Sequence, residues 1–352
     1  MGFIHDEVEK AGFEVDWFCA DDLPPRWQGR LSRYAFPWLL RSYLIRKYRE
    51  GVRYAWINVH EQCAVGLVFN REAFGSPRVA LTSHGAEERG WALALKDHRE
   101  GKQPLKLFTR IVFPLVFLNA IRLSHRQADH VFCLNQEDRR FFQERYHRAS
   151  SSITHMSPGA GEAFGRDAST RDYNRMERVL FSGTWRRNKG VEYLAEAMKC
   201  VMSAFPSIEF SVLGGGVSAS EIRDRFPEDL RHRVTVIQVS DDAGSAEVYA
   251  SHDLFVLPSL FEGTPLTLIE SMWSGLPITT TSTCGMRDVI EHDVDGLLVE
   301  PGMKDPLENA IRRLIEDSGL RRRLGKAARE KAEKKYSWSK VAETVVRAYQ
   351  EA

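Results

Sequence analysis

The chain has 352 residues, of which 43% are hydrophobic and 28% are charged, and its formal net charge is +1. This length is sufficient for two domains with separate cores, and a net charge near zero gives no indication of a polyanionic partner such as nucleic acid. The five cysteines are odd in number and form no Cys-x-x-Cys pair. We therefore expect a reduced, cytoplasmic protein without a zinc site.

The first residues show no signal-peptide pattern, and residues 1–20 read as the end of a helix followed by a strand at 13–19. The longest apolar run, residues 111–121, is shorter than the ~20 residues that span a bilayer. We therefore expect no membrane-spanning segment. The wider segment 105–126 mixes this run with four basic residues and favours a core helix with a basic rim.

A second basic and aromatic segment lies at residues 26–53. It carries eight Lys or Arg residues and one acid, Glu50, interleaved with six aromatic side chains. Two interpretations stay open. The segment is either an ordinary amphipathic surface helix or a face for an anionic membrane or a lipid-linked acceptor.

Short apolar runs alternate with amphipathic segments along most of the chain. The runs predict buried strands at 54–60, 78–84, 130–135, 178–183, 209–214, 234–239, 253–259 and 277–282. Between them lie helical patterns, such as the apolar stripe of 191–205. This alternation indicates the α/β class, with parallel sheets covered on both faces.

The polar stretch 165–178 interrupts the alternation once, and we place a domain linker there. The chain then has two α/β halves, 1–165 and 166–335, followed by a last amphipathic helix at 336–352. In the first half, three predicted strands end at His60, His84 and Asn135. Because the carboxyl ends of parallel strands share one edge, we expect these three side chains to face a ligand cleft.

The stretch LFEGTPLTLIE, residues 260–270, places Glu262 in a loop and Glu270 in a helix that is apolar nearly all round. Thr264 suits the N-cap and Pro265 the first helical position, so the helix is predicted over 265–274. A carboxylate in such a place needs a cation or hydroxyl donors. The vicinal diol of a sugar offers two donors in a suitable fork.

The helix start at residues 264–266 offers backbone amides and the positive end of a dipole, which is an anion site. Glu262 and Glu270 can accept hydroxyls on either side of this phosphate-binding helix start, which is the arrangement expected of a nucleotide-sugar site. The alternative is that Glu262 is solvated and that Glu270 pairs with a basic residue of a neighbouring helix.

A second cluster of charge lies in FSGTWRRNKGVEYL, residues 181–194, where a strand gives way to a helix. Ligands bind at this edge of open α/β sheets. We interpret Arg186 as a surface cation. We expect Lys189 to contact a diphosphate, because it precedes a helix start that faces the same crevice.

Four segments carry a resemblance to a known family: SGTWRRNKG, LGGG, DLFVLPSLFEGTPLTLIESMWSGLPITTT and DGLLVEPG. In order over 178–345, they resemble the C-terminal domain of glycosyltransferase family 4. The segments TSHGAEER, ADHVFCLNQED and ITHMSPGAGEAF resemble its N-terminal domain more loosely. The resemblance implies retaining enzymes of the GT-B fold, in which two Rossmann-like domains have parallel sheets that face each other across a cleft.

The resemblance also assigns roles to residues. It implies that Glu262 contacts the donor sugar, Glu270 binds the ribose, Lys189 holds the diphosphate, and His84 lies near the reacting sugar. The catalytic residues are then Glu262, Lys189 and His84. The donor-binding residues are Gly183, Arg187, Lys189, Gly214, Glu262, Gly263, Thr264, Pro265, Leu266 and Glu270.

Three features depart from the family pattern. Many members have Arg where this chain has Thr184, and Arg187 is a candidate substitute. Pro158-Gly159 lacks the Asn that usually stands between them. The opening strand and glycine-rich turn of the first domain are missing, so we expect a first sheet without its usual first strand.

The resemblance implies a retaining glycosyltransferase of the hexosyltransferase type, acting in polysaccharide or glycoconjugate biosynthesis. In the expected arrangement 1–165 binds the acceptor, a glycan or lipid-linked glycan, and 166–335 binds a UDP- or GDP-linked sugar. The helix at 336–352 packs back on the first domain. We expect no metal, because the DVD of 293–295 reads as a turn. We expect a cytoplasmic protein, and if 26–53 is a membrane face rather than an ordinary surface helix, the protein is peripheral at the inner membrane face. A GT-B nucleotide-sugar epimerase and a non-catalytic nucleotide-sugar-binding protein remain alternatives.

Overall fold

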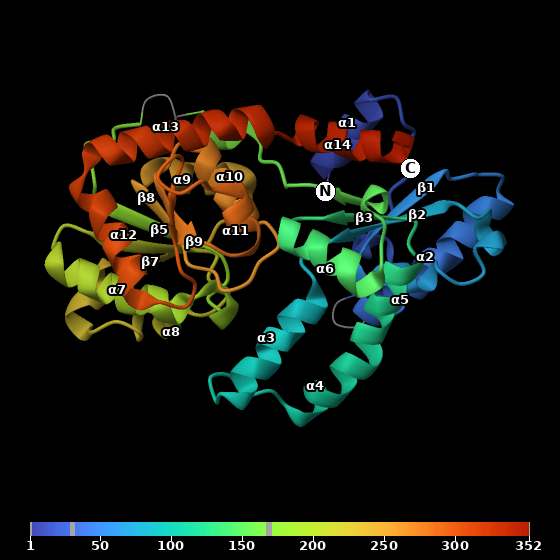
Figure 1. The fold of residues 1–352 in the computed structure, drawn as a ribbon, viewed down its shortest axis with the longest axis horizontal. Coiled ribbons are helices and arrows are strands. Elements are labelled where there is room, and N and C mark those ends of the chain that lie inside the picture. The colour runs from blue at the N-terminus through green and yellow to red at the C-terminus, as the bar shows by residue number, and fades with distance from the viewer. Residues whose placement is uncertain (1, 29–31, 167–170, 352) are drawn as a thin grey trace. The chain divides into compact units, whose positions relative to one another are not determined.

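The computed structural model describes residues 2–28, 32–166 and 171–351. The chain forms two compact units, one of residues 1–156 with 342–352 and one of residues 157–341. Each unit has its own parallel sheet (Figure 1). The expected boundary after residue 165 lies further along the chain than this division. Part of the expected linker at 165–178, residues 167–170, lies outside the described residues.

The first unit contains four parallel strands in the order β1-β2-β3-β4. These are β1 (Trp56–His60), β2 (Arg78–Ser83), β3 (His130–Cys133) and β4 (Ile153–His155). The strand residues Val79, Leu81 and Val131 are fully buried, as expected where both faces of a parallel sheet are covered. Its larger helices are α1 (Gly2–Lys10), α2 (Ser32–Arg49), α3 (Glu87–Arg99), α4 (Leu107–Val112), α5 (Asn119–Gln127) and α6 (Gln136–Tyr146).

The strand expected at 13–19 is not formed. This segment is extended but has no backbone ladder, and the described residues before Trp56 contain no strand. Instead, Asp16 accepts hydrogen bonds from the hydroxyls of Tyr43 and Tyr54, and the Phe18 ring stacks on Tyr43 at 4.6 Å. Side chains therefore hold the segment. An alternating pattern fits such a segment as well as it fits a strand.

The C-terminal helix α14 (Trp338–Glu351) contributes to the first unit through its end. The Tyr349 ring stacks on Trp56 at 5.0 Å and meets the Phe132 ring edge-on at 5.8 Å. Its hydroxyl accepts a hydrogen bond from Asn58 at 2.8 Å. The last turn of the chain thus completes the packing on the β1–β3 part of this sheet.

The expectation of a core helix over 105–126 is wrong for its first half. The chain there forms α4, a π-helical turn η6 (Phe113–Leu118) that contains Pro114, and α5. Ile121 and His125 of the second half are buried, whereas Leu107 and Phe108 are 67% and 72% exposed. By length and composition, Leu107–Gln127 is long and apolar enough to cross a membrane, the one such helix among the described residues.

The second unit contains six parallel strands in the order β10-β9-β8-β5-β6-β7. They are β5 (Arg178–Ser182), β6 (Glu209–Leu213), β7 (Val234–Ile237), β8 (Leu254–Leu257), β9 (Ile278–Thr281) and β10 (Leu297–Val299). The longer helices around them are α7 (Val191–Ala204), α9 (Asp242–Ser251), α10 (Leu266–Trp273), α12 (Lys304–Glu316) and α13 (Ser318–Lys335). All eight strands predicted from apolar runs are confirmed; the short strands β4 and β10 were not among them.

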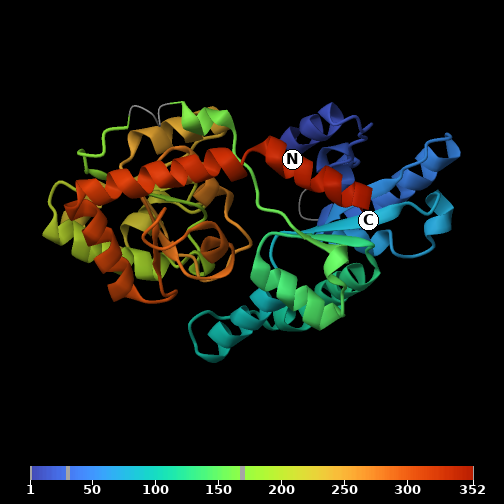
Figure 2. The ribbon, with the colours of Figure 1, turned by 45° about the horizontal axis from the view of Figure 1, so that its top comes forward.

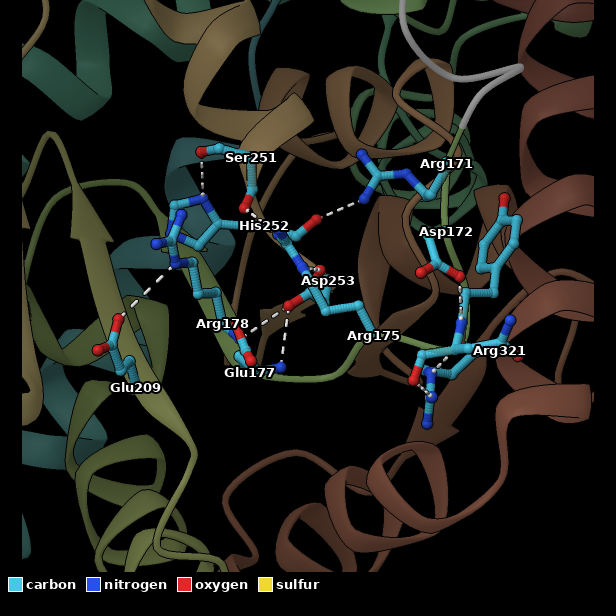
Figure 3. A network of polar contacts seen from close by, with 12 residues as sticks. Arg171, Asp172, Arg175, Glu177, Arg178, Glu209, Ser251, His252, Asp253 and Arg321 are labelled. Carbon is cyan, nitrogen blue, oxygen red and sulfur yellow. Dashed lines mark hydrogen bonds and ion pairs between the residues drawn. The ribbon is translucent and has the colours of Figure 1, made fainter.

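The chain that enters β5 is held to the second unit by a polar network (Figure 3). Arg171 donates to the carbonyls of Tyr249, His252 and Ser274. The buried Asp253 accepts the backbone N–H groups of Glu177 and Arg178, both at 2.9 Å, and pairs with Arg175 at 2.9 Å. Residues 171–178 are therefore part of the second unit's structure and not a free linker.

We expect Asp253→Ala to lower the free energy of unfolding by about 3 kcal/mol, because it leaves two backbone amides and a guanidinium without their acceptor. Urea unfolding measures the loss. The matched control is Glu209→Ala in the same network, whose pair with Arg178 at 3.7 Å is exposed. The control should lose less than about 1 kcal/mol. Equal losses would contradict the assignment of Asp253 as the centre of the network.

Candidate functional site

The strand order of the second unit reverses between β5 and β8. From β5 the chain proceeds outward through β6 and β7, and from β8 it proceeds outward through β9 and β10. The crevice at the carboxyl ends of two such strands is where open α/β sheets bind ligands. The loops that leave β5 and β8 therefore form the candidate site.

These two loops touch through their backbones. The N–H of Leu260 donates to the carbonyl of Asn188 at 2.7 Å. Gly190 has φ +70°, and a Cβ there would lie 1.9 Å from the carbonyl oxygen of Pro258. Only glycine fits a left-handed backbone this close to another chain. Gly190 therefore allows the start of α7 to contact the end of β8.

This contact brings together Lys189 and Glu262, the two charged residues that the sequence predicts in one site. Lys189 Nζ lies 2.5 Å from Glu262 Oε1, and the Ser259 hydroxyl donates to the same oxygen at 3.1 Å. Both charged side chains are mostly shielded from solvent. Gly183 lies beside the lysine: a Cβ on it would be 3.6 Å from Lys189 Cε. Glu262 is thus an ion-paired carboxylate and not a solvated one.

Glu270 lies on α10 and has a hydroxyl partner. The fully buried Tyr249 of α9 donates to Glu270 Oε2 at 2.9 Å. Burial raises the pKa of Glu270 to about 7, although this hydrogen bond opposes the shift. The expected alternative, a Lys or Arg partner from a neighbouring helix, is not what the described residues provide. Sequence reasoning missed Tyr249, because nothing in residues 242–251 marks it.

The turn before α10 differs slightly from the prediction. The helix begins at Leu266 with Pro265 at the N-cap, so the expectation of Thr264 as N-cap is wrong by one residue. Gly285 donates its N–H to the Gly263 carbonyl at 2.9 Å, and a Cβ on Gly285 would lie 2.2 Å from Thr264 Oγ1. This backbone contact fixes the turn. A glycine inside a helical pattern was the available signal for Gly285.

The other predicted donor-binding residues are near the same edge. The N–H of Trp185 donates to the Gly215 carbonyl at 2.6 Å, so the loop after β6, which contains Gly214, is tied to the loop after β5. Gly214 has φ +70°, which favours glycine. Arg187 pairs with Glu192 on α7. A contact between Arg187 and a phosphate stays a prediction.

The carboxyl edge of the first unit gathers two of its three predicted side chains. The rings of His60 and His84 stack at 4.7 Å, and Glu61 accepts the backbone N–H of His84. Burial and the neighbouring His84 lower the pKa of His60 to about 4, and burial raises that of Glu61 to about 8. Asn135 does not fit the expectation. It is buried and caps α6, because its side chain accepts the N–H of Asp138 at 2.7 Å.

The DVD segment forms a turn, as predicted. The N–H of Asp293 donates to the Gly296 carbonyl at 2.9 Å. Asp295 is buried, accepts the N–H of Glu291 at 2.8 Å, and pairs with Lys331 at 2.6 Å. Its carboxylate is therefore committed to structure.

We expect Gly190→Ala to destabilise the protein by about 2–4 kcal/mol and to disturb the Lys189–Glu262 pair, because a Cβ displaces either α7 or the Pro258 loop. Chemical unfolding gives the free energy. Gly161→Ala is the control, since φ is −82° and a Cβ there meets nothing within 4 Å. A Gly190 variant as stable as the control would show that the two loops do not depend on this contact.

The raised pKa of Glu270 makes stability depend on pH. Between its ordinary value of 4.5 and about 7, the folded chain holds a proton on Glu270 that the unfolded chain has lost. The wild type should therefore lose unfolding free energy relative to Glu270→Gln as the pH rises through this range, with no further change above it. Urea unfolding of both proteins across the range measures the difference. A difference that does not change with pH would contradict the raised pKa.

Residues 167–331 match the family described as glycosyl transferases group 1. An uncharacterized glycosyltransferase of Methanocaldococcus jannaschii is 28% identical over 187 residues, which are 53% of this chain and 47% of that protein. The chain spans about half the length, or less, of the curated relatives it matches.

Solved structures resemble nearly the whole chain. Sucrose-phosphate synthase from Thermosynechococcus elongatus has a TM-score of 0.71 at 20% identity. The match covers 92% of this chain and 81% of the synthase. Anabaena HepE in complex with UDP has a TM-score of 0.68 at 17% identity, with 99% and 89% covered. The fold is therefore GT-B, and residues 167–331 carry the similarity to glycosyl transferases group 1.

Proposed function

We propose that this protein is a retaining glycosyltransferase of the family 4 type, which moves a sugar from a nucleoside-diphosphate donor to a hydroxyl acceptor. The observation that carries the proposal is the Lys189–Glu262 pair at the strand-order reversal of the second unit. The match of residues 167–331 to glycosyl transferases group 1 supports it.

Glu270 is assigned to the ribose of the donor. Its carboxylate accepts one hydrogen bond from Tyr249, and an ionised carboxylate has about four acceptor sites. The 2′- and 3′-hydroxyls of a ribose supply two donors to the remaining sites. The neutral Tyr249 hydroxyl leaves the charge of Glu270 uncompensated, so hydroxyl donors gain more there than they would beside a lysine.

Lys189 is assigned to the diphosphate and Glu262 to the sugar. The ammonium has three donors, so it can hold Glu262 and a phosphate oxygen together. The backbone amides at the start of α10, at Gly263–Leu266, add donors and the positive end of the helix dipole. The remaining capacity of the Glu262 carboxylate then accepts hydroxyls of the sugar.

In this reaction the bond between the anomeric carbon and the phosphate oxygen breaks while the acceptor oxygen bonds to the same face of that carbon. The acceptor proton passes to the leaving phosphate, which takes the electron pair of the broken bond. Lys189 and the amides of α10 stabilise the negative charge that develops there. His84 is assigned to the vicinity of the reacting sugar.

The finer assignments follow the same scheme. The donor carries UDP or GDP, and the solved complex of Anabaena HepE with UDP supports a uridine nucleotide. The acceptor is a glycan or lipid-linked glycan bound by the first unit, in polysaccharide or glycoconjugate biosynthesis. We assign the protein to the cytoplasm, where its odd number of cysteines fits a reducing environment. We assign no metal to the reaction, since Lys189 and backbone amides supply the positive charge.

Equilibrium binding of uridine, UDP, guanosine and GDP tests the site in the wild type, Lys189→Ala and Glu270→Gln. We expect one base to be preferred. Lys189→Ala should weaken binding of the diphosphate by about tenfold or more while leaving the nucleoside nearly unchanged, because it removes only a phosphate contact. Glu270→Gln should weaken both to a similar degree.

The control is Lys199→Ala, a half-buried lysine of α7 that pairs with Glu196 on the same helix. Absence of nucleotide binding in the wild type would overturn the donor site. Binding without transfer or donor hydrolysis would favour a nucleotide-sugar-binding protein, and isomerisation of the donor without an acceptor would favour an epimerase.

A further inference from the structure

The helix α4 and the turn η6 expose an unusually apolar surface. Its members are 49% to 72% exposed, and we call them the apolar ridge: Leu107, Phe108, Ile111, Leu115 and Val116. Phe108 and Ile111 follow the α-helical spacing i, i+3, which places them on one helix face, and Leu115 and Val116 continue the exposed surface onto the turn η6. A contiguous apolar surface of this kind marks a contact with a partner or a membrane.

Two aromatic residues of α2, spaced i, i+4, are exposed on one helix face, and one of them contacts the helix that carries the apolar ridge. The Tyr34 ring lies 5.2 Å from that of Phe117, and Tyr34 and Trp38 are 48% and 53% exposed. Tyrosine and tryptophan are typical of the boundary between a bilayer and water. On another side, the Phe113 ring packs against Trp91 of α3 at 4.8 Å, so α3 covers part of the helix and leaves the apolar ridge open.

The surroundings of the apolar ridge are basic. Residues 96–110 contain five Lys or Arg residues and two acids, Asp97 and Glu100, which gives +5 − 2 = +3 with histidine neutral. Asp97 is buried. Lys106 and Arg110 are exposed and flank the segment of Leu107, Phe108 and Thr109 in the chain. This charge complements an anionic surface.

The geometry favours lying on a bilayer over crossing it. The second half of the helix is fixed in the first unit, because Arg122 pairs with Glu88 and Ile121 and His125 are buried. Residues 107–117 precede the buried Leu118, and at 1.5 Å per residue they extend only about 17 Å, against about 30 Å of hydrocarbon. Figures 1 and 2 both show α3 and α4 extending away from the β1–β4 sheet.

The basic residues of α2 and its neighbourhood are largely used within the unit. Arg41 donates to the carbonyls of Gly66 and Phe69, and Lys47 pairs with Asp16. The Arg53 guanidinium stacks over the Tyr48 ring at 3.8 Å. The segment 26–53 therefore offers a membrane its two exposed aromatics more than a free basic face; residues 29–31 of it lie outside the described residues.

We propose that this protein docks on an anionic phospholipid surface through the apolar ridge. Phe108, Ile111 and Leu115 enter the headgroup boundary, Tyr34 and Trp38 lie beside them, and Lys106 and Arg110 contact lipid phosphates. The inference does not depend on the proposed reaction, because neither the ion pair nor Glu270 takes part in it. It replaces 26–53 with 107–116 as the main membrane contact.

Co-sedimentation of the full chain with phospholipid vesicles tests the proposal. We expect binding to phosphatidylcholine vesicles that contain about one third phosphatidylglycerol, and much weaker binding to phosphatidylcholine alone or at high salt. The variant Phe108→Ser/Ile111→Ser/Leu115→Ser should bind more than about tenfold more weakly. Lys106→Glu/Arg110→Glu should weaken vesicle binding by a similar factor, since each cation near such a surface raises the affinity roughly fivefold.

The control is Val294→Ser/Met303→Ser, which removes two exposed apolar side chains of the second unit and should bind vesicles like the wild type. Circular dichroism and thermal unfolding establish that each variant is folded, and nucleotide binding should be unchanged in all of them. Failure of the wild type to bind anionic vesicles would overturn the proposal. So would wild-type binding by the triple variant, or a dimer in sedimentation velocity that the triple variant dissolves without any effect of lipid.

Discussion

The backbone contact between Gly190 and the Pro258 carbonyl is the constraint on which the candidate site depends. After β5 and after β8 the chain proceeds toward opposite edges of the sheet, which would otherwise carry the two loops apart. Here the absence of one Cβ lets the start of α7 meet the loop after β8, and the Leu260 N–H bond to Asn188 holds them together. Lys189 and Glu262 then pair across this contact.

Around this contact, burial determines the electrostatic character of the two carboxylates, Glu262 and Glu270. The 2.5 Å pair of Lys189 with Glu262 keeps two charges together in a shielded place, whereas burial raises the pKa of Glu270 to about 7 even though the Tyr249 hydroxyl donates to its carboxylate. Two carboxylates eight positions apart thus differ in character. One is charged and paired, and the other is available to neutral hydroxyl donors.

Apolar runs predicted the sheet strands well, because burial on both faces of a parallel sheet leaves a plain pattern at 178–183 or 253–259. That Lys189 and Glu262 lie at one edge of the sheet was also predictable, from their position after such runs, while their roles stay predictions. The predictions that were wrong concern residues whose structure depends on partners distant in the sequence. Residues 13–19 alternate like a strand but find side chains of α2, and Asn135 follows a strand but caps α6. The exposure of 107–116 could not be predicted, because apolar composition does not show whether another part of the protein covers the helix.

The position of Tyr349 in the chain has a consequence for the order in which the two units complete their packing during synthesis. Its ring and hydroxyl pack on Trp56, Asn58 and Phe132, yet Tyr349 follows the strands of both units in the chain and is synthesised after them. The unit of residues 157–341 has all of its strands translated earlier. The first unit therefore acquires this part of its packing only after every strand of the second unit has been synthesised, and its β1–β3 surface lacks Tyr349 until then.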